Sequence, residues 1–252
     1  MTAENPPAPQ DGPGMLLLDL TLPTPAENLA LDEALLEWLE PHPGGEALRF
    51  WESDAPFVVL GAGGRVEEEV LTARCAAAGV PVLRRCSGGG TVLQGPGCLN
   101  YALVLDRTLR PEMDSIEGTN RAVLGRVAAA LARLGAPASM RGTSDLVARG
   151  RKFSGNAQRR RKTHILFHGT ILHHFALDRM GDLLREPPRQ PDYRAHRTHD
   201  RFVRNLRVDP ARVRAGIAAE WDARTPAHDW PRDITARLVE TRYSRDEWNL
   251  CF

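Results

Sequence analysis

The chain of 252 residues lacks several features that would each indicate a class of protein. No segment approaches the ~20 apolar residues that a membrane-spanning helix needs. The net charge is only +1, so the large basic excess of a general nucleic-acid binder is missing. Four cysteines form no CxxC pair, and no HExxH motif accompanies the histidines, which argues against a structural zinc site. We therefore expect neither a membrane nor a nucleic acid as a partner, and the sequence leaves any metal ligands undetermined.

The N-terminal stretch has few apolar side chains. Residues 1–14 read MTAENPPAPQDGPG, which predicts a disordered leader. The stretch has no basic start followed by an apolar run, so it is not a secretory signal, and we expect a cytoplasmic protein. Residues 15–252 are long enough for a single domain with a substantial core. A short helical tail, from about residue 190 to 252, is too thin for a separate domain and is expected to join it.

Lysine is almost missing as well. Lys152 and Lys162 are the only two among 33 basic residues. Lys162 follows three arginines, a run typical of a solvated surface. Lys152 lies between Gly150 and Gly155, which allow a tight turn or a close approach to a ligand. Because an ammonium meets one oxygen end-on, whereas a guanidinium is a planar fork, we interpret Lys152 as a functional residue.

Short periodic segments predict an α+β fold. Helices are expected from a capping box at Thr24 onward, then over 66–79, around 124–134, near 209–223 and near 230–243. Strands are expected at 47–51, 57–60 and 82–85, with a hairpin joining 91–93 to 99–105. Links between strands at 145–148, 152–157 and 163–172 are too short for helical crossovers, so these strands should pair antiparallel. The sequence thus predicts a mostly antiparallel sheet flanked by helices.

A glycine-rich turn follows the strand expected at 82–85. It reads Arg84-Arg85-Cys86-Ser87-Gly88-Gly89-Gly90. Successive glycines let backbone amides face an anion, and arginines can grip a phosphate or a carboxylate. Neither nucleotide-binding fingerprint, GxxxxGK[ST] or GxGxxG, is present. The residues by themselves leave two interpretations open, an acyl or phosphoryl binding loop and an ordinary flexible turn.

Three stretches in combination resemble a known family. RRCSGGGTVLQGPGCLNYAL, SDLVARGRKFSGNAQRRR and HILFHGTIL resemble the lipoate protein ligase A family of the biotin and lipoate attachment superfamily, from about residue 28 to 172. The resemblance implies the catalytic fold shared by class II aminoacyl-tRNA synthetases and biotin–lipoate ligases. It also implies that ATP and Mg²⁺ activate lipoate or octanoate as an acyl adenylate, with no tightly bound cofactor. The acyl group then passes to a lysine of a lipoyl carrier domain, of the 2-oxoacid dehydrogenase E2 or glycine cleavage H protein type.

The resemblance also implies roles for individual residues. Lys152 would contact the carboxyl and phosphate oxygens of the mixed anhydride and is the expected catalytic residue. Val92 would line the acyl slot, and Arg159 and His168 would lie on the adenylate side. The full set of implied binding residues is Arg85, Ser87, Gly88, Gly89, Gly90, Val92, Gly155, Arg159, His168 and Gly169, with Trp51, Asn100 and Asp145 as further candidates. Asp145 either caps a turn or orients Lys152.

Two departures from the family leave alternatives open. Long bacterial ligases carry a C-terminal accessory domain, whereas this chain has the thin tail, so adenylation either uses a separate accessory chain or does not occur. Related octanoyltransferases use a cysteine shortly before the counterpart of Asp145, but residues 139–144 contain none. Cys86 and Cys98 could carry a thioester, although their places in or beside strands favour small core residues. An ATP-dependent ligase is the leading hypothesis, followed by an octanoyltransferase and a non-catalytic protein that binds an acyl ligand or a carrier domain.

Overall fold

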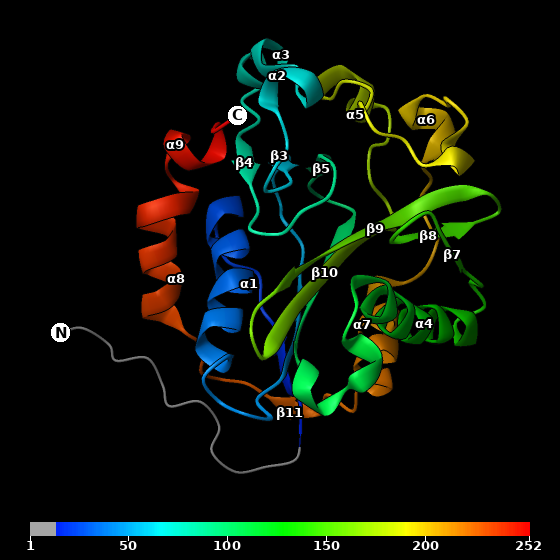
Figure 1. The fold of residues 1–252 in the computed structure, drawn as a ribbon. Coiled ribbons are helices and arrows are strands. Elements are labelled where there is room, and N and C mark those ends of the chain that lie inside the picture. The colour runs from blue at the N-terminus through cyan, green and yellow to red at the C-terminus, as the bar shows by residue number, and fades with distance from the viewer. Residues whose placement is uncertain (1–13) are drawn as a thin grey trace.

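Two β-sheets of different size organise the chain (Figure 1). The computed structural model describes residues 14–252, so the leader expected at residues 1–14 lies almost wholly outside the described residues. The larger sheet has eight strands in the order β11-β1-β2-β6-β10-β9-β8-β7. Its strands are β1 (Leu16–Asp19), β2 (Ala47–Trp51), β6 (Cys98–Asp106), β7 (Ser139–Arg141), β8 (Asp145–Ala148), β9 (Arg151–Arg160), β10 (His164–Leu172) and β11 (Thr225–Pro226). All neighbours are antiparallel except β1, which runs parallel to β2 and β11, so the predicted mostly antiparallel sheet is confirmed.

The smaller sheet was not predicted. It places β3 (Phe57–Leu60) between β4 (Val82–Arg84) and β5 (Val92–Gln94). The hairpin expected between residues 91–93 and 99–105 is wrong, because β5 pairs with β3 whereas β6 pairs with β2 and β10. The turn between them contains Gly95 and Gly97, both at positive φ. A side chain on Gly97 would overlap the backbone at His174, so this turn fits against the end of β10 and sends the chain into the other sheet.

One face of the large sheet carries the main core. Helices α4 (Ile116–Arg133) and α7 (Pro210–Glu220) cover this face and contact each other. Sheet residues such as Tyr101 and Phe167, whose rings stack at 6.5 Å, pack there against apolar side chains of both helices. The expected helices around 124–134 and 209–223 are therefore present, and the second belongs to the tail.

Helix α1 (Pro25–Leu39) covers the opposite face. It begins at the expected capping box, in which Thr24 and Glu27 satisfy each other's backbone amides. Leu31 and Leu35 pack against the sheet, and α8 (Arg232–Leu238) lies on the outer side of α1 (Figure 1). Because α1 is covered on both sides, 11 of its 15 residues are buried, among them the charged Asp32 and Glu33.

The helix expected over residues 66–79 is interrupted. It consists of α2 (Val66–Glu69) and α3 (Thr72–Ala77). Between them Val70 is extended and bridges to Leu184, while the amide of Leu71 donates to the carbonyl of Leu183 over 2.9 Å. Pairing with a distant segment has thus overridden local helix propensity.

The remaining elements are short. They are the 3-10 turns η1 (Arg107–Leu109), η2 (Pro111–Met113) and η3 (Asp192–Arg194), the helices α5 (Arg179–Leu183), α6 (His199–Phe202) and α9 (Asp246–Asn249), and the π-helical turn η4 (Val239–Tyr243). The tail from about residue 190 packs on the body at several places, through α7 on α4, α8 on α1 and β11 on β1. Of the helices in the described part of the chain, none combines the length and the apolar character needed to cross a bilayer.

Candidate active site

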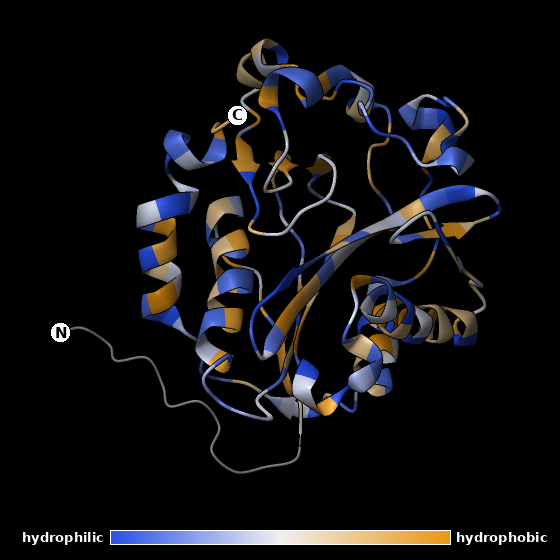
Figure 2. Cartoon of the chain, in the orientation of Figure 1, coloured by the Kyte–Doolittle hydropathy of each residue, from blue (hydrophilic) through white to orange (hydrophobic). Residues whose placement is uncertain are grey.

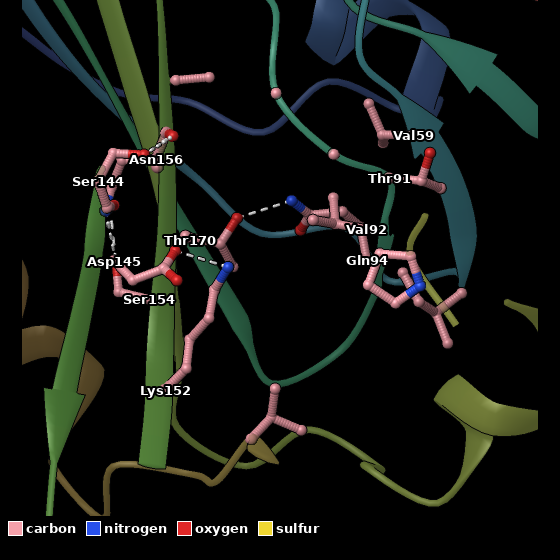
Figure 3. Close-up of a pocket in the computed structure, with 18 of the residues that line it drawn as sticks. Val59, Thr91, Val92, Gln94, Ser144, Asp145, Lys152, Ser154, Asn156 and Thr170 are labelled. Atoms are coloured by element: carbon pink, nitrogen blue, oxygen red, sulfur yellow. Dashed lines mark hydrogen bonds and ion pairs between the residues drawn. The ribbon is translucent and has the colours of Figure 1, made fainter. Parts of the chain in front are cut away.

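A pocket of about 570 Å³ lies between the two sheets. This volume falls in the range typical of small-molecule sites. Figure 3 shows Val59, Val92 and Gln94 of the small sheet facing Lys152 and Thr170 of the large one. Figure 2 shows β9 as largely hydrophilic and β10 beside it with hydrophobic residues. The lining combines apolar side chains, such as Trp51, Val59 and Val92, with polar groups, as a site for an amphipathic ligand requires.

Lys152 extends over β9 into the pocket. Its Nζ lies 2.7 Å from Oδ1 of Asp145, and 25% of its side chain is exposed. A Cβ on Gly155 would lie 2.9 Å from both Cε and Nζ of Lys152, so a side chain there would displace the end of Lys152 from this position. The other oxygen of Asp145 accepts from the hydroxyl of Tyr193 over 2.6 Å. Because burial raises the pKa of Tyr193, the phenol stays protonated and donates. Asp145 thus pairs with Lys152, the contact that the second of its two expected roles, orienting Lys152, requires.

The glycine-rich turn is held together by Arg85. The guanidinium donates to the hydroxyl of Ser87 over 3.1 Å and to the carbonyls of Gly88 and Gly90 over 2.6 and 3.0 Å. Burial lowers the pKa of Arg85 to about 10. Arg85 lines the pocket, but its guanidinium is hydrogen-bonded within the turn and stabilises the conformation of the turn. The backbone of Gly88–Gly90 is consequently the more accessible part of this loop.

His168 joins the turn to a buried polar cluster. Its Nε2 lies 2.5 Å from the hydroxyl of Ser87, and its Nδ1 lies 3.5 Å from a carboxylate oxygen of Asp32. Asp32 is itself paired with the fully buried Arg49 at 2.6 Å. A carboxylate on one side and a hydroxyl on the other fix the orientation of the imidazole. Sequence reasoning missed Asp32, whose place in an amphipathic helix gave no signal of its own.

A second set of hydrogen bonds crosses the pocket. Gln94 of the small sheet donates to the hydroxyl of Thr170 over 2.7 Å, and Thr170 donates to Asn100 over 2.7 Å. On the other face of the sheet, Tyr101 donates to Asn156 over 2.5 Å. A side chain on Gly169 would overlap Asn156, so Gly169 is required for that bond. The Gln94–Thr170 bond joins the two sheets across the pocket, and the other two bonds lie within the large sheet.

A polar segment after α5 contributes residues to the lining of the pocket. Arg185 and Arg189 line it with exposed side chains, and neither forms an ion pair with another residue of the range 14–252. The segment is anchored by the amide of Arg185, which donates to Glu69 over 3.0 Å. Lys152 and these two unpaired arginines line the same pocket and give it a positive charge suited to an anion. Sequence reasoning treated this stretch as irregular, although its arginines offered a signal.

The structure brings most of the predicted residues together. The pocket is lined by Trp51, Arg85, Gly89, Gly90, Val92, Asn100, Asp145, Lys152, Gly155, His168 and Gly169. Ser87 and Gly88 are not part of the lining: Ser87 is buried and contacts Arg85 and His168, whereas Gly88 is exposed and accepts from Arg85. Arg159 is exposed on β9 and lies outside the lining. No cluster of three or more metal-ligating side chains occurs within the described residues.

The chain is similar to proteins of one family. The family model for the lipoyl protein ligase A/B catalytic domain matches residues 24–211. Lipoate-protein ligase LplJ of Bacillus subtilis is 33% identical over 68% of this chain and 50% of that protein. Octanoyltransferase LipM of Anoxybacillus flavithermus is 26% identical over 90% of this chain and 94% of its own length. The chain spans about half the length of the lipoate-protein ligases it first matches.

Solved structures share the whole fold. A bipartite lipoate protein ligase of Thermoplasma acidophilum, studied with its E2 lipoyl domain, superposes with a TM-score of 0.79 at 26% identity, covering 94% of this chain and 96% of that one. A lipoate-protein ligase A bound with ATP gives 0.78 at 26% identity, covering 94% and 98%. A T. acidophilum protein with bound lipoic acid gives 0.80 at 25% identity, covering 95% and 99%. The fold is accordingly the biotin–lipoate ligase catalytic fold that the resemblance implied, and the chain belongs to the lipoyl protein ligase A/B catalytic-domain family.

Proposed function

We propose that the chain is a cytoplasmic enzyme that activates lipoate or octanoate with ATP and transfers the acyl group to a lysine of a lipoyl carrier domain. The observation that carries the proposal is the Lys152 ammonium, held 2.7 Å from Asp145 inside a pocket bordered by the glycine-rich turn. Similarity to ligases whose structures contain lipoic acid or ATP supports it. Trp51, Val59 and Val92 provide the apolar wall that an acyl chain needs.

In the first half-reaction, a carboxylate oxygen of the acyl substrate attacks the α-phosphorus of ATP, and the bond to pyrophosphate breaks. Negative charge grows on the phosphate oxygens as this bond breaks, and a preorganised ammonium such as Lys152 stabilises it. Arg185 and Arg189 supply two further cations for the departing pyrophosphate. A magnesium ion would be held mainly by phosphate oxygens, with Asp145 as a pocket carboxylate that could join them.

In the second half-reaction, the neutral amine of the carrier lysine attacks the acyl carbon. The carbon–oxygen bond to AMP breaks, AMP leaves, and the amine loses a proton to solvent. Lys152 stabilises the oxygen that becomes negative on the acyl carbon. The acceptor is an E2 or H protein lipoyl domain, and a separate accessory chain assists adenylation, as the bipartite composition of the T. acidophilum ligase suggests.

Mass spectrometry of the carrier tests the proposal. The purified protein is incubated with ATP, Mg²⁺, lipoate or octanoate and an unmodified lipoyl domain, with and without a candidate accessory chain. We expect the carrier to gain the mass of one acyl group only when ATP is present. If no carrier gains mass under any of these conditions, the ligase proposal is wrong.

An octanoyltransferase is the second candidate, because the LipM relative matches along nearly its whole length. Such an enzyme would hold the acyl group as a thioester on Cys86 or Cys98. Both thiols are buried, and burial raises the pKa of each, which disfavours the reactive thiolate. The chain is incubated with octanoyl-acyl carrier protein and its mass is measured. A gain of one octanoyl group, prevented by prior alkylation of the cysteines, would favour this candidate over the ligase.

A further inference from the structure

Positive charge is concentrated in two segments of the chain. Residues 139–152 and 185–207 together contain 11 basic and 4 acidic residues, a net charge of +7. The whole chain has a net charge of +1, so the remaining residues sum to −6. The small net charge of the whole chain is therefore the sum of a strongly basic part and an acidic remainder.

The fold joins these segments into one surface, here called the basic rim (residues 139–152 and 185–207). Arg204 donates its amide to the carbonyl of Lys152 over 2.8 Å, and Arg197 donates to the carbonyl of Gly150 over 3.0 Å. The Tyr193–Asp145 bond links them again. Figure 1 shows α6 beside the ends of β8 and β9. Since Lys152 also lines the pocket, the basic rim borders its mouth.

Much of this charge is free to meet a partner. Exposed arginines of the rim that form no ion pair with any other residue in the range 14–252 are Arg141, Arg149, Arg185, Arg189, Arg201 and Arg207. Other arginines of the rim are bound within the protein, such as Arg194, which forms an ion pair with Glu186. Long-range fields from unpaired exposed charges steer and orient an oppositely charged partner.

We infer that the basic rim docks an acidic face of the carrier domain and thereby directs its lysine into the pocket. The inference rests on the proposed function, because only a macromolecular acceptor needs a surface around the pocket mouth. Nucleic acid fits less well. Single strands stack on exposed aromatic rings, whereas Phe202 of the rim is 3% exposed beneath the guanidinium groups of Arg194 and Arg197.

Direct binding of an unacylated lipoyl domain tests the inference independently of turnover. Calorimetric titration compares the native protein with the double variant Arg149→Glu/Arg201→Glu. Arg212→Glu is the control, since Arg212 is exposed on α7, which packs against α4. We expect the double variant to bind the carrier about tenfold more weakly at low salt and the control to stay within about twofold of native. The difference should shrink at about 0.5 M salt, where charges are screened within a few ångströms.

Two outcomes would overturn the docking surface. One is equal affinity of the native protein and the double variant for the carrier, or no carrier binding at all. The other is displacement of the carrier by a single-stranded RNA oligonucleotide at comparable concentration, which would assign the rim to nucleic acid. Pyrophosphate release without carrier, with any required accessory chain present, is measured in parallel. Its failure in the native protein would contradict the ligase proposal, while its retention in the double variant shows that the pocket is intact.

Discussion

At the scale of single residues, the position of the Lys152 ammonium depends on the absence of a side chain at Gly155. Gly155 lies under the aliphatic end of Lys152, and an added methyl group would come within 2.9 Å of Nζ. We predict that Gly155→Ala displaces the ammonium and lowers adenylation about tenfold or more, measured as pyrophosphate release, while the protein still folds. Gly125→Ala is the matched control. Gly125 lies in α4 with open space around its Cα, so that change should leave the rate unchanged.

The scarcity of lysine made Lys152 stand out as a candidate functional residue from the sequence alone, because only two of the basic residues are lysines. Asp32 could not be found this way. It belongs to the same helical pattern as its apolar neighbours, and only the contacts with Arg49 and His168 reveal it. Arg85 was recognised as important, but its partners proved to be the carbonyls of its own turn. Which groups a side chain meets depends on distant segments, and a local pattern does not contain them.

At the scale of elements, the C-terminal helix α9 supports the glycine-rich turn. Asn249, which is 3% exposed, accepts from the amide of Arg84 over 3.0 Å and donates to the carbonyl of Tyr243 over 2.9 Å. We predict that Asn249→Ala lowers the free energy of unfolding by about 1–3 kcal/mol, because a buried amide loses its acceptor. Urea denaturation measures this change. Thr241→Ala, at an exposed site on η4, should change stability by less than about 0.5 kcal/mol. Equal losses in both variants would contradict the proposed support.

A carboxylate joins the ends of three strands and should make stability depend on pH. After β2, Glu52 accepts from the amide of Gly97 over 2.7 Å and contacts His173 at 3.1 Å, beside the ends of β6 and β10. The hydrogen bond with His173 is the main cause that lowers the pKa of Glu52. A lowered folded-state pKa stabilises the protein above the unfolded value near 4.5, and this contribution is lost as pH falls through the folded value.

We therefore predict that Glu52→Gln lowers the free energy of unfolding at neutral pH and that this difference shrinks below about pH 4. Denaturant titrations across pH measure it. The exposed neighbour Asp54 provides the control, and Asp54→Asn should show a smaller difference at neutral pH. A Glu52→Gln effect that stayed constant down to acidic pH would rule out this linkage.

The start of the long helix α1 and the antiparallel pairing of strands joined by short links were predictable from the sequence. The pairing of very short strands was not. The capping box gave the start of α1, and the short links gave the antiparallel order of β8, β9 and β10. The three residues of β5 were assigned to the wrong partner, because a run that short pairs wherever the tertiary structure offers an edge. The break at Val70 likewise depends on Leu184, more than 100 residues away in the sequence.

At the scale of the whole molecule, the pocket is built from both sheets, so a ligand there should stabilise the entire fold. Lipoate together with ATP at about 100 times the dissociation constant would add about 2.7 kcal/mol to the free energy of unfolding. We predict a rise in Tm of several degrees, measured by differential scanning calorimetry. Acetate with ATP should give a smaller rise, since acetate has no chain to fill the apolar wall. Equal shifts with acetate and with lipoate would contradict an acyl pocket between the sheets.

The most direct measurement is the rate of lipoate-dependent pyrophosphate release, made with any required accessory chain, for Lys152→Met beside Lys162→Met. The two variants remove the two lysines of the chain one at a time, and Lys162 is exposed and lies outside the pocket. We predict that Lys152→Met lowers the rate about 100-fold or more, as expected when a preorganised donor worth about 3 kcal/mol is lost. Lys162→Met should stay within about twofold of native. Equal rates for the two variants would contradict a catalytic role for Lys152.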